Sequence, residues 1–475
     1  MDTTIAFINN LLWGSLLVYL LLGAGAFFTI RLGFIQFRHF GHMFSVLKYS
    51  RRSDDAGISS FQALCTSLAA RVGTGNLAGV AVALYLGGPG AIFWMWLIAL
   101  IGMSTAFAES ALAQLYKVKD EQGNYRGGPA YYMEKGLGMR WMGMLFAVFL
   151  IIAFGLVFNA VQANSISVAM EVAFGIPEWA TGVALVLGAG LIIFGGLRTI
   201  ARFAELVVPL MALAYLVIAL VVVAMNITEL PGVFMLIIKS ALGLEQAGGG
   251  AIGYAISQAL MNGIKRGLFS NEAGMGSAPN AAASASPYPP HPASQGYVQM
   301  LGVFIDTLVI CTCTASIILL SGQFEPGSGV TGIELTQRAL SHEVGEWGSI
   351  FIAIAILFFA FTSIVANYAY AENNIVFLEH DSKAGLLTFR LFVLGMVMFG
   401  SIGELPTIWA LADISMGLMA LTNLVAILLL SGVAVKLARD YNDQRKLGKV
   451  PTFDATKYPE LHSQLEEGIW DNNKK

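Results

Sequence analysis

The sequence predicts an all-α integral membrane protein, and three observations lead to this prediction. Of the 475 residues, 56% are hydrophobic and only 12% are charged, which leaves too little polar material to cover a soluble globule of this size. Apolar stretches long enough for a helical crossing, about 20 residues, recur along the chain with short polar connectors. Basic residues also gather in alternate connectors, as the positive-inside rule requires.

Eleven apolar segments are expected to be membrane-spanning helices. They lie at 11–34, 58–86, 89–116, 141–172, 179–197, 203–227, 248–286, 296–321, 347–379, 386–403 and 407–435. Most Lys and Arg residues fall in the connectors after the first, third, fifth and ninth segments and in the C-terminal tail. These parts are assigned to the cytoplasm, so the N-terminus is expected outside and the C-terminus inside.

Other function classes find little support in the sequence. The net charge of -3 gives no basic field for nucleic acid. Cys65, Cys311 and Cys313 lie in apolar runs and are interpreted as packing residues, so neither a disulfide nor a bound cofactor is expected. An ion channel favours repeated filter loops or a lining of like charges. An intramembrane enzyme needs a catalytic set, and none of the six histidines lies deep in an expected crossing.

Two expected helices contain polar, glycine-rich interruptions. One is Ala-Arg-Val-Gly-Thr-Gly-Asn at 70–76, and the other is Ser-Asn-Glu-Ala-Gly-Met-Gly-Ser-Ala-Pro at 270–279. Backbone without its own hydrogen bonds persists at membrane depth only around a cavity, a ligand or an ion. Close packing of small residues is the alternative interpretation. Because Lys265 and Arg266 precede the second interruption, a break at 261–263 also stays open.

The spacing of the two breaks predicts an internal repeat. If the first segment is accessory, the breaks fall in the first and sixth helices of a ten-helix core, and a five-helix repeat must be inverted because five is odd. The expected parts are an accessory helix (1–36), a cytoplasmic loop (37–57), the first repeat (58–227), the second repeat (248–435) and a cytoplasmic tail (436–475). The tail is expected to be solvated or a weak docking segment.

Four stretches of the sequence resemble the alanine or glycine:cation symporter family. They are Arg-Val-Gly-Thr-Gly-Asn-Leu-Ala-Gly-Val at 71–80, Arg-Gly-Gly-Pro-Ala-Tyr-Tyr-Met at 126–133, Asn-Glu-Ala-Gly-Met-Gly-Ser-Ala-Pro-Asn at 271–280 and Asn-Tyr-Ala-Tyr-Ala-Glu-Asn-Asn at 367–374. The resemblance implies a LeuT-like fold, sodium-coupled import of alanine, glycine or similar neutral amino acids, and a place in the lipid bilayer of a bacterial cytoplasmic membrane. It leaves monomer and oligomer open.

An amino-acid zwitterion requires donors for its carboxylate and acceptors for its ammonium group. Free N–H groups after the first break suit the carboxylate, and unwound carbonyls of the second break, helped by a side-chain amide, suit the ammonium. The residues expected at the substrate are Gly73, Thr74, Gly75, Asn76, Gln162, Asn164, Gly274, Met275, Gly276 and Asn367. Bonds between helices are the alternative role for the amides. The family's pattern places a site residue at Asn164.

Sodium prefers several oxygen ligands, and the ninth segment offers the hydroxyls of Thr362 and Ser363. Hydroxyls in membrane helices also bond back to the preceding turn, which is the competing interpretation. The LeuT-like resemblance implies that the pair meets carbonyls just before the first break, here Ala69 and Val72, with the carbonyl of Phe359 completing the shell.

Asn367 lies one helical turn after Ser363 and is expected to face the same cavity. The family often has a larger aromatic residue there. An amide in place of an aromatic wall enlarges the pocket or gives it a hydrogen bond, so the departure leaves the exact substrate open. Alanine and glycine are the expected substrates.

Charged residues beside the breaks suggest two further roles. Arg71 and Glu272 flank the breaks, so they form either a gating ion pair or a static structural pair. The alternative to sodium coupling is a proton-coupled carrier, in which Glu109 or Glu272 titrates during transport.

Overall fold

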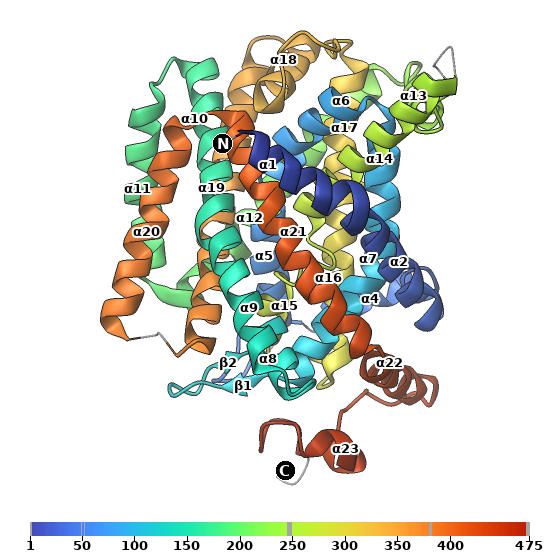
Figure 1. Cartoon of the computed structure of the whole chain (residues 1–475), viewed down its shortest axis with the longest axis vertical. Coiled ribbons are helices and arrows are strands. Elements are labelled where there is room, and N and C mark those ends of the chain that lie inside the picture. The colour runs from blue at the N-terminus through green and yellow to red at the C-terminus, as the bar shows by residue number, and fades with distance from the viewer. Residues whose placement is uncertain (1, 49, 52, 245–248, 380–381, 472–475) are drawn as a thin grey trace.

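The computed structural model describes residues 2–471 except 49, 52, 245–248 and 380–381. Long helices run roughly along one axis of the molecule (Figure 1). The first half of the chain forms α1 (Asp2–Asn9), η1 (Asn10–Leu17), α2 (Val18–Arg31), α3 (Ile35–Arg38), α4 (Phe40–Leu47), α5 (Ser60–Arg71), η2 (Gly75–Gly79), α6 (Val80–Gly87), α7 (Gly90–Leu115), β1 (Val118–Lys119), β2 (Tyr125–Arg126), α8 (Pro129–Lys135), α9 (Arg140–Leu150), η3 (Ile151–Val157), α10 (Phe158–Phe174), α11 (Glu178–Ile193) and α12 (Gly196–Met225).

The second half continues the helical bundle and ends in a short helical tail. Its elements are α13 (Leu230–Ala241), α14 (Gly249–Asn271), α15 (Pro279–Ala283), α16 (Pro292–Val303), η4 (Phe304–Cys311), α17 (Thr312–Leu320), α18 (Gly332–Val344), α19 (Trp347–Phe377), α20 (Lys383–Ile402), α21 (Leu405–Leu429), α22 (Ser431–Lys446), η5 (Ala455–Lys457) and α23 (Pro459–His462). In Figure 1, α13 and α18 lie at one end of the bundle, and α22, α23 and the β1–β2 pair lie at the other.

The helices confirm the membrane-protein class. Within the described residues, eight helices are long and apolar enough to cross a membrane, and the bent pair of α5 and α6 makes up to nine. Each of the eleven expected segments contains a helix. However, α11 has only 16 residues, and position 248, where the seventh segment was expected to begin, lies outside the described residues. The count of eleven crossings therefore stays a prediction.

The first break separates α5 from η2 and α6. A capping box starts α5, in which Ser59 Oγ accepts from the Gln62 N–H at 3.1 Å and Gln62 Oε1 accepts from the Ser59 N–H at 3.1 Å. The helix ends at Arg71 because Val72 has φ −77° and ψ 89°, outside the helical region. The chain resumes a helix at Gly75 with its axis turned by 49°.

The second break follows Asn271, where α14 ends. Glu272 has φ 59°, and Gly274 and Gly276 have φ 90° and 85°, which is the region that favours glycine. Pro279 then starts α15, at the helix position that proline tolerates. The break therefore lies near Gly274. The alternative break at 261–263 is wrong, because α14 is continuous there.

Lys265 and Arg266 remain inside α14 because a carboxylate of α21 neutralises them. Arg266 forms an ion pair with Asp413, and Lys265 Nζ lies 3.8 Å from the Asp413 carboxylate. The Arg266 guanidinium also lies 4.4 Å from the centre of the Trp409 ring, a favourable cation–π distance. A charge inside a membrane helix is costly unless it is paired, and this triad supplies the pairing.

The loops assigned to the cytoplasm meet at one end of the bundle. Ile58 forms a bridge with Ala285, and the Tyr125 N–H donates to the Ala56 carbonyl at 2.9 Å. The Phe453 N–H donates to the Pro290 carbonyl at 3.0 Å, so the tail joins the same assembly. This grouping agrees with the alternation of basic connectors, whereas the outside and inside assignment itself stays a prediction.

The described part of the tail is docked, so of the two expected alternatives, a solvated segment and a docking segment, it agrees with the second. Trp470 is buried, and its Nε1 donates to the Leu115 carbonyl at the end of α7 at 3.1 Å. Phe453 packs edge-on against Trp470 and is stacked on Tyr458. These three aromatic rings thus form a small core against α7, although few apolar residues surround them in the sequence. Residues 472–475 lie outside the described residues.

Candidate functional site

The first break presents its backbone donors to amide side chains. The Gly73 N–H donates to Asn76 Oδ1 at 2.9 Å, and the Thr74 N–H donates to Gln162 Oε1 at 2.9 Å. Free donors were predicted here, and two of the three N–H groups instead have protein partners. The reason is that a buried N–H without an acceptor is costly. The expected residues Gly73, Thr74, Asn76 and Gln162 are brought together.

Gly73 is held tightly between α10 and α19. A Cβ atom at Gly73 would collide with the Ser363 hydroxyl and would lie 2.7 Å from Gln162 Oε1. Gly75 also has a close neighbour, since its Cβ would lie 3.2 Å from the Ser270 Cα. Only glycine therefore allows the first break to approach both the amide and the hydroxyl.

The residues expected around sodium lie beside the same break. Ser363 Oγ donates to the Ala69 carbonyl at 2.7 Å and lies 3.0 Å from the Phe359 carbonyl, to which Thr362 Oγ1 donates at 2.9 Å. Both hydroxyls thus bond back to the preceding turn, and Ser363 also reaches across to α5. Val72 is the first residue after α5, and its N–H donates to the Leu68 carbonyl at 2.7 Å. Neutral oxygens of this kind suit a hard cation.

The second break is anchored by Glu109 of α7. The Gly274 N–H donates to Glu109 Oε1 at 3.1 Å. Asn423 of α21 donates its amide to Glu109 Oε2 at 2.8 Å and to the Gly274 carbonyl at 2.9 Å. The carbonyl expected to accept an ammonium group thus already has a donor. Met275 is buried beside it.

Asp306, which was not among the predicted site residues, connects the two breaks. Its Oδ1 accepts from Asn76 at 2.7 Å, and its Oδ2 accepts from Ser270 at 2.6 Å. The Asn76 amide also donates to Ser270 Oγ at 3.1 Å. The signal was present, because Asp306 is a single acidic residue in the apolar run 296–321 and a buried intramembrane carboxylate indicates a functional site.

The expected amides divide between two places. Asn367 donates to Asn159 Oδ1 at 3.1 Å, one helical turn from Ser363, and its own Oδ1 has no partner among the described residues. Asn164 donates to the Gly400 and Gly403 carbonyls at 3.1 and 2.8 Å, at the end of α20. Residues two positions apart on a helix point in nearly opposite directions. Asn164 therefore points away from the contact that Gln162 makes with the first break.

The ion pair expected between Arg71 and Glu272 is not formed. Among the described residues, no salt bridge within 4.0 Å joins them; Arg71 Nη1 donates to the Gln299 carbonyl at 3.3 Å, and Glu272 Oε2 accepts from Ser277 Oγ at 2.6 Å. Both side chains are buried. The Arg71 Nε and Nη2 atoms have no partner in the described part of the chain. A gating role for the two charges stays a prediction.

A helical membrane protein with two broken helices that meet at a buried polar centre is a secondary transporter. Comparison with known proteins gives its family. The chain belongs to the sodium:alanine symporter family, which it matches over residues 1–455. It is therefore not an enzyme but a symporter.

Two relatives and one solved structure show how far the similarity extends. The chain is 53% identical to the transporter YaaJ of Escherichia coli strain K12, over 98% of both chains. It is also 53% identical to the probable sodium/glutamine symporter GlnT of Bacillus subtilis strain 168, over 94% of this chain and 91% of GlnT. A crystal structure of a mutant manganese transporter from Eremococcus coleocola is similar in fold alone, with a TM-score of 0.50 and 14% identity over 79% of this chain and 78% of that one.

Proposed function

We propose that this transporter imports a small neutral amino acid, alanine or glycine, together with sodium. The observation that carries the proposal is the meeting of Ala69, Gly73, Gln162 and Ser363, which joins the first break to α10 and α19. Import proceeds by alternating access across a bacterial cytoplasmic membrane, with the N-terminus outside. The substrate binds between the two broken helices.

The substrate carboxylate takes the donors that Gln162 and Asn76 now occupy. A carboxylate is charged, and charge-assisted hydrogen bonds are roughly twice as strong as neutral ones. It therefore displaces an amide oxygen from the N–H groups of Gly73 and Thr74. Gln162 is then free to turn toward the substrate ammonium group. The same side chain thus bonds to the Thr74 N–H in the empty site and to the substrate in the occupied site.

Sodium binds at the Ala69 and Phe359 carbonyls and the Thr362 and Ser363 hydroxyls, with Val72 next to them. The Ala69 carbonyl belongs to the last turns of α5, just before the first break. A cation there holds α5 against α19 and so favours one arrangement of the break. Ion binding thereby shifts the conformational equilibrium of the substrate site, which is what coupling requires.

A glutamine-sized substrate is a second candidate, and one observation favours it. The unpartnered Asn367 Oδ1 is buried beside Asn159, and a buried carbonyl oxygen without a donor is costly. A substrate side-chain amide would supply that donor. The relative GlnT is named as a probable glutamine symporter, which agrees with this candidate.

Proton coupling is the alternative to sodium. Glu109, Glu272 and Asp306 are buried close to Arg71, and intramembrane carboxylates form proton relays in other carriers. In this alternative one carboxylate takes up a proton in each transport cycle, and the oxygens around Ser363 hold only the helices together.

The test is uptake of labelled alanine, glycine and glutamine into proteoliposomes that contain the purified full-length protein. Inward sodium, potassium and proton gradients are compared. Uptake of alanine or glycine under the sodium gradient alone supports the proposal. Uptake that follows the proton gradient and ignores sodium selects the alternative ion, and preference for glutamine selects the second substrate.

A further inference from the structure

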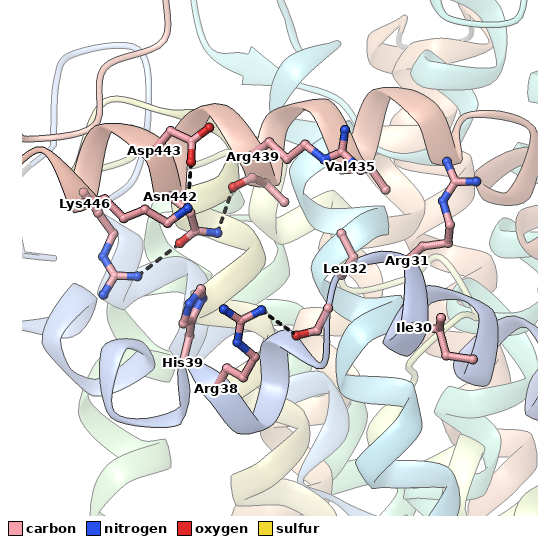
Figure 2. A pocket seen from close by; sticks show the side chains of 13 residues that line it. Ile30, Arg31, Leu32, Arg38, His39, Val435, Arg439, Asn442, Asp443 and Lys446 are labelled. Atoms are coloured by element: carbon pink, nitrogen blue, oxygen red, sulfur yellow. Dashed lines mark hydrogen bonds and ion pairs between the residues drawn. The ribbon is translucent and has the colours of Figure 1, made fainter.

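A strongly basic hollow lies between the end of the first long helix and α22 (Figure 2). Its volume is about 450 Å³. One wall is the turn from α2 into α3, which contributes Arg31 and Arg38, and the other wall is α22, which contributes Arg439. Arg445 and Lys446 complete the set of five cationic side chains.

The positive charge of the hollow is almost uncompensated. Among the described residues that line the hollow, Asp443 is the single carboxylate, and it pairs with Lys446 at 2.9 Å. Two of the arginines bond instead to neutral groups: Arg38 Nη1 donates to the Gly33 carbonyl at 3.3 Å, and Arg445 Nη1 donates to Asn442 Oδ1 at 3.1 Å. Four of the five cations therefore lack an acidic partner among the described residues.

The cations of the hollow also affect the pKa of His39. Its ring lines the hollow, and its pKa is lowered to about 4 by burial and by the charges of Arg445, Arg38 and Lys446. His39 is therefore neutral at physiological pH and adds no charge of its own. Burial makes the largest contribution to this shift, and the three neighbouring cations add to it; the same cations attract an anion.

The hollow lies where the chain leaves the membrane. Arg31 ends a helix of 28 residues that is long and apolar enough to span a bilayer. Next to it, Ile30 is 66% exposed, and Phe37 and Phe44 of the following short helices are 55% and 48% exposed. Apolar and aromatic side chains beside basic ones, at the end of a spanning helix, are typical of a membrane interface.

Arg31 and Arg439 are the central cations of this region. Both also line a second hollow on the other flank of α22. Both side chains are exposed. Arg31 lies over the Phe27 ring at 5.5 Å, and no acidic partner of Arg439 is found in the described part of the chain. An anion bound between α2 and α22 would thus be reached by both.

We propose that this hollow binds the phosphate of an anionic phospholipid headgroup, with the acyl chains lying against Ile30 and the exposed phenylalanines. Arginine matches phosphate with paired N–H donors, and basic pockets at helix ends bind anionic headgroups. The excess of positive charge disfavours a headgroup that carries a cation of its own. The apolar border favours a lipid phosphate over free phosphate, because free phosphate has no acyl chain to lie against these apolar side chains.

The experiment measures lipid retained by the purified full-length protein in detergent by native mass spectrometry. Phosphatidylglycerol, phosphatidylcholine and inorganic phosphate are the probes. The test variant is R31Q/R439Q, and the control is K119Q/K449Q, which loses the same charge from two exposed lysines outside both hollows. R439Q alone is a milder second variant. Unfolding midpoints without lipid show that all variants are folded.

The expected result is that wild type and control retain phosphatidylglycerol over phosphatidylcholine, and that R31Q/R439Q loses this affinity by roughly tenfold. R439Q is expected to lose a smaller part. Equal retention of phosphatidylglycerol in wild type and R31Q/R439Q would overturn the proposal, as would equal retention of the two lipids. Displacement of phosphatidylglycerol by millimolar inorganic phosphate would assign the site to free phosphate and overturn the lipid.

Discussion

The Ser363 hydroxyl donates to the Ala69 carbonyl at 2.7 Å and so joins α19 to the helix that precedes the first break. This contact places an oxygen of a continuous helix against the last turns of an interrupted one. A cation that replaces the hydroxyl proton as the partner of the carbonyl can bind only while the two helices stay together. Sodium coupling in our account rests on this contact.

Because Gly73 is packed tightly against Ser363 and Gln162, we predict that the variant G73A does not transport. The added methyl group would overlap the Ser363 hydroxyl and crowd Gln162, and overpacking of this kind costs about 1–3 kcal/mol. We expect uptake to be lost at normal expression. The matched control is G395A, because a Cβ at Gly395 of α20 meets nothing within 4 Å. Full uptake by G73A would show that the first break does not pack as described.

The anchoring of the second break predicts that E109A is less stable and does not transport. The substitution leaves the Gly274 N–H and the Asn423 amide without their acceptor, and each buried group left unpaired costs about 1–3 kcal/mol. E109Q keeps one acceptor oxygen and should lose less. Thermal unfolding in detergent measures the difference. E121Q, at an exposed position, is the control, and an unfolding midpoint of E109A equal to that of E121Q would contradict the anchoring role.

The docking of the tail predicts that W470A is destabilised. Trp470 is buried and donates to the Leu115 carbonyl, and removal of a buried Trp side chain costs about 3–5 kcal/mol. Limited proteolysis should then cut the tail faster than in wild type. W179A is the control, because Trp179 is 62% exposed. If W470A and W179A were cut at the same rate, the tail would not be held by Trp470.

The half-buried histidines of the basic end, His39 and His42, predict a loss of stability on acidification. Burial and the charge of Arg445 lower the pKa of His39 and of His42 from 6.5 to about 4. Between these values the unfolded chain binds protons that the folded chain does not, so stability falls as pH falls from 6.5 toward 4. Unfolding midpoints at pH 6.5 and 4.5 should differ less in H39Q/H42Q than in wild type. An equal difference in both proteins would exclude these histidines as a cause.

The sequence predicted the parts of the fold that depend on local chemistry. Apolar length predicted the helices, and glycine with competing side chains predicted the breaks at 70–76 and 270–279. These features need no knowledge of distant contacts, because helix formation and interruption are decided within a few residues. The position of Ser363 beside the first break, by contrast, was predicted from the family resemblance and depends on a distant contact.

Features that depend on distant partners were not predicted. The bonds of Asp306 to Asn76 and Ser270 join residues more than 35 positions apart. The same is true of Glu109, whose carboxylate accepts from the Gly274 N–H, 165 positions further along the chain. Asn164 faces α20 because of the rotation of α10 about its own axis, and the hydropathy of the sequence does not specify this rotation. The docked tail depends on a few aromatic residues whose partners lie on α7.

The most direct test of sodium coupling is the sodium dependence of alanine uptake by S363A in proteoliposomes. S401A is the control, because Ser401 is also buried in a helix and its hydroxyl, among the residues that the structure describes, bonds only to the preceding turn, at 2.9 Å from the Val397 carbonyl. We predict that S363A needs at least tenfold more sodium for half-maximal uptake, whereas S401A behaves like wild type. Unchanged sodium dependence in S363A would contradict the account.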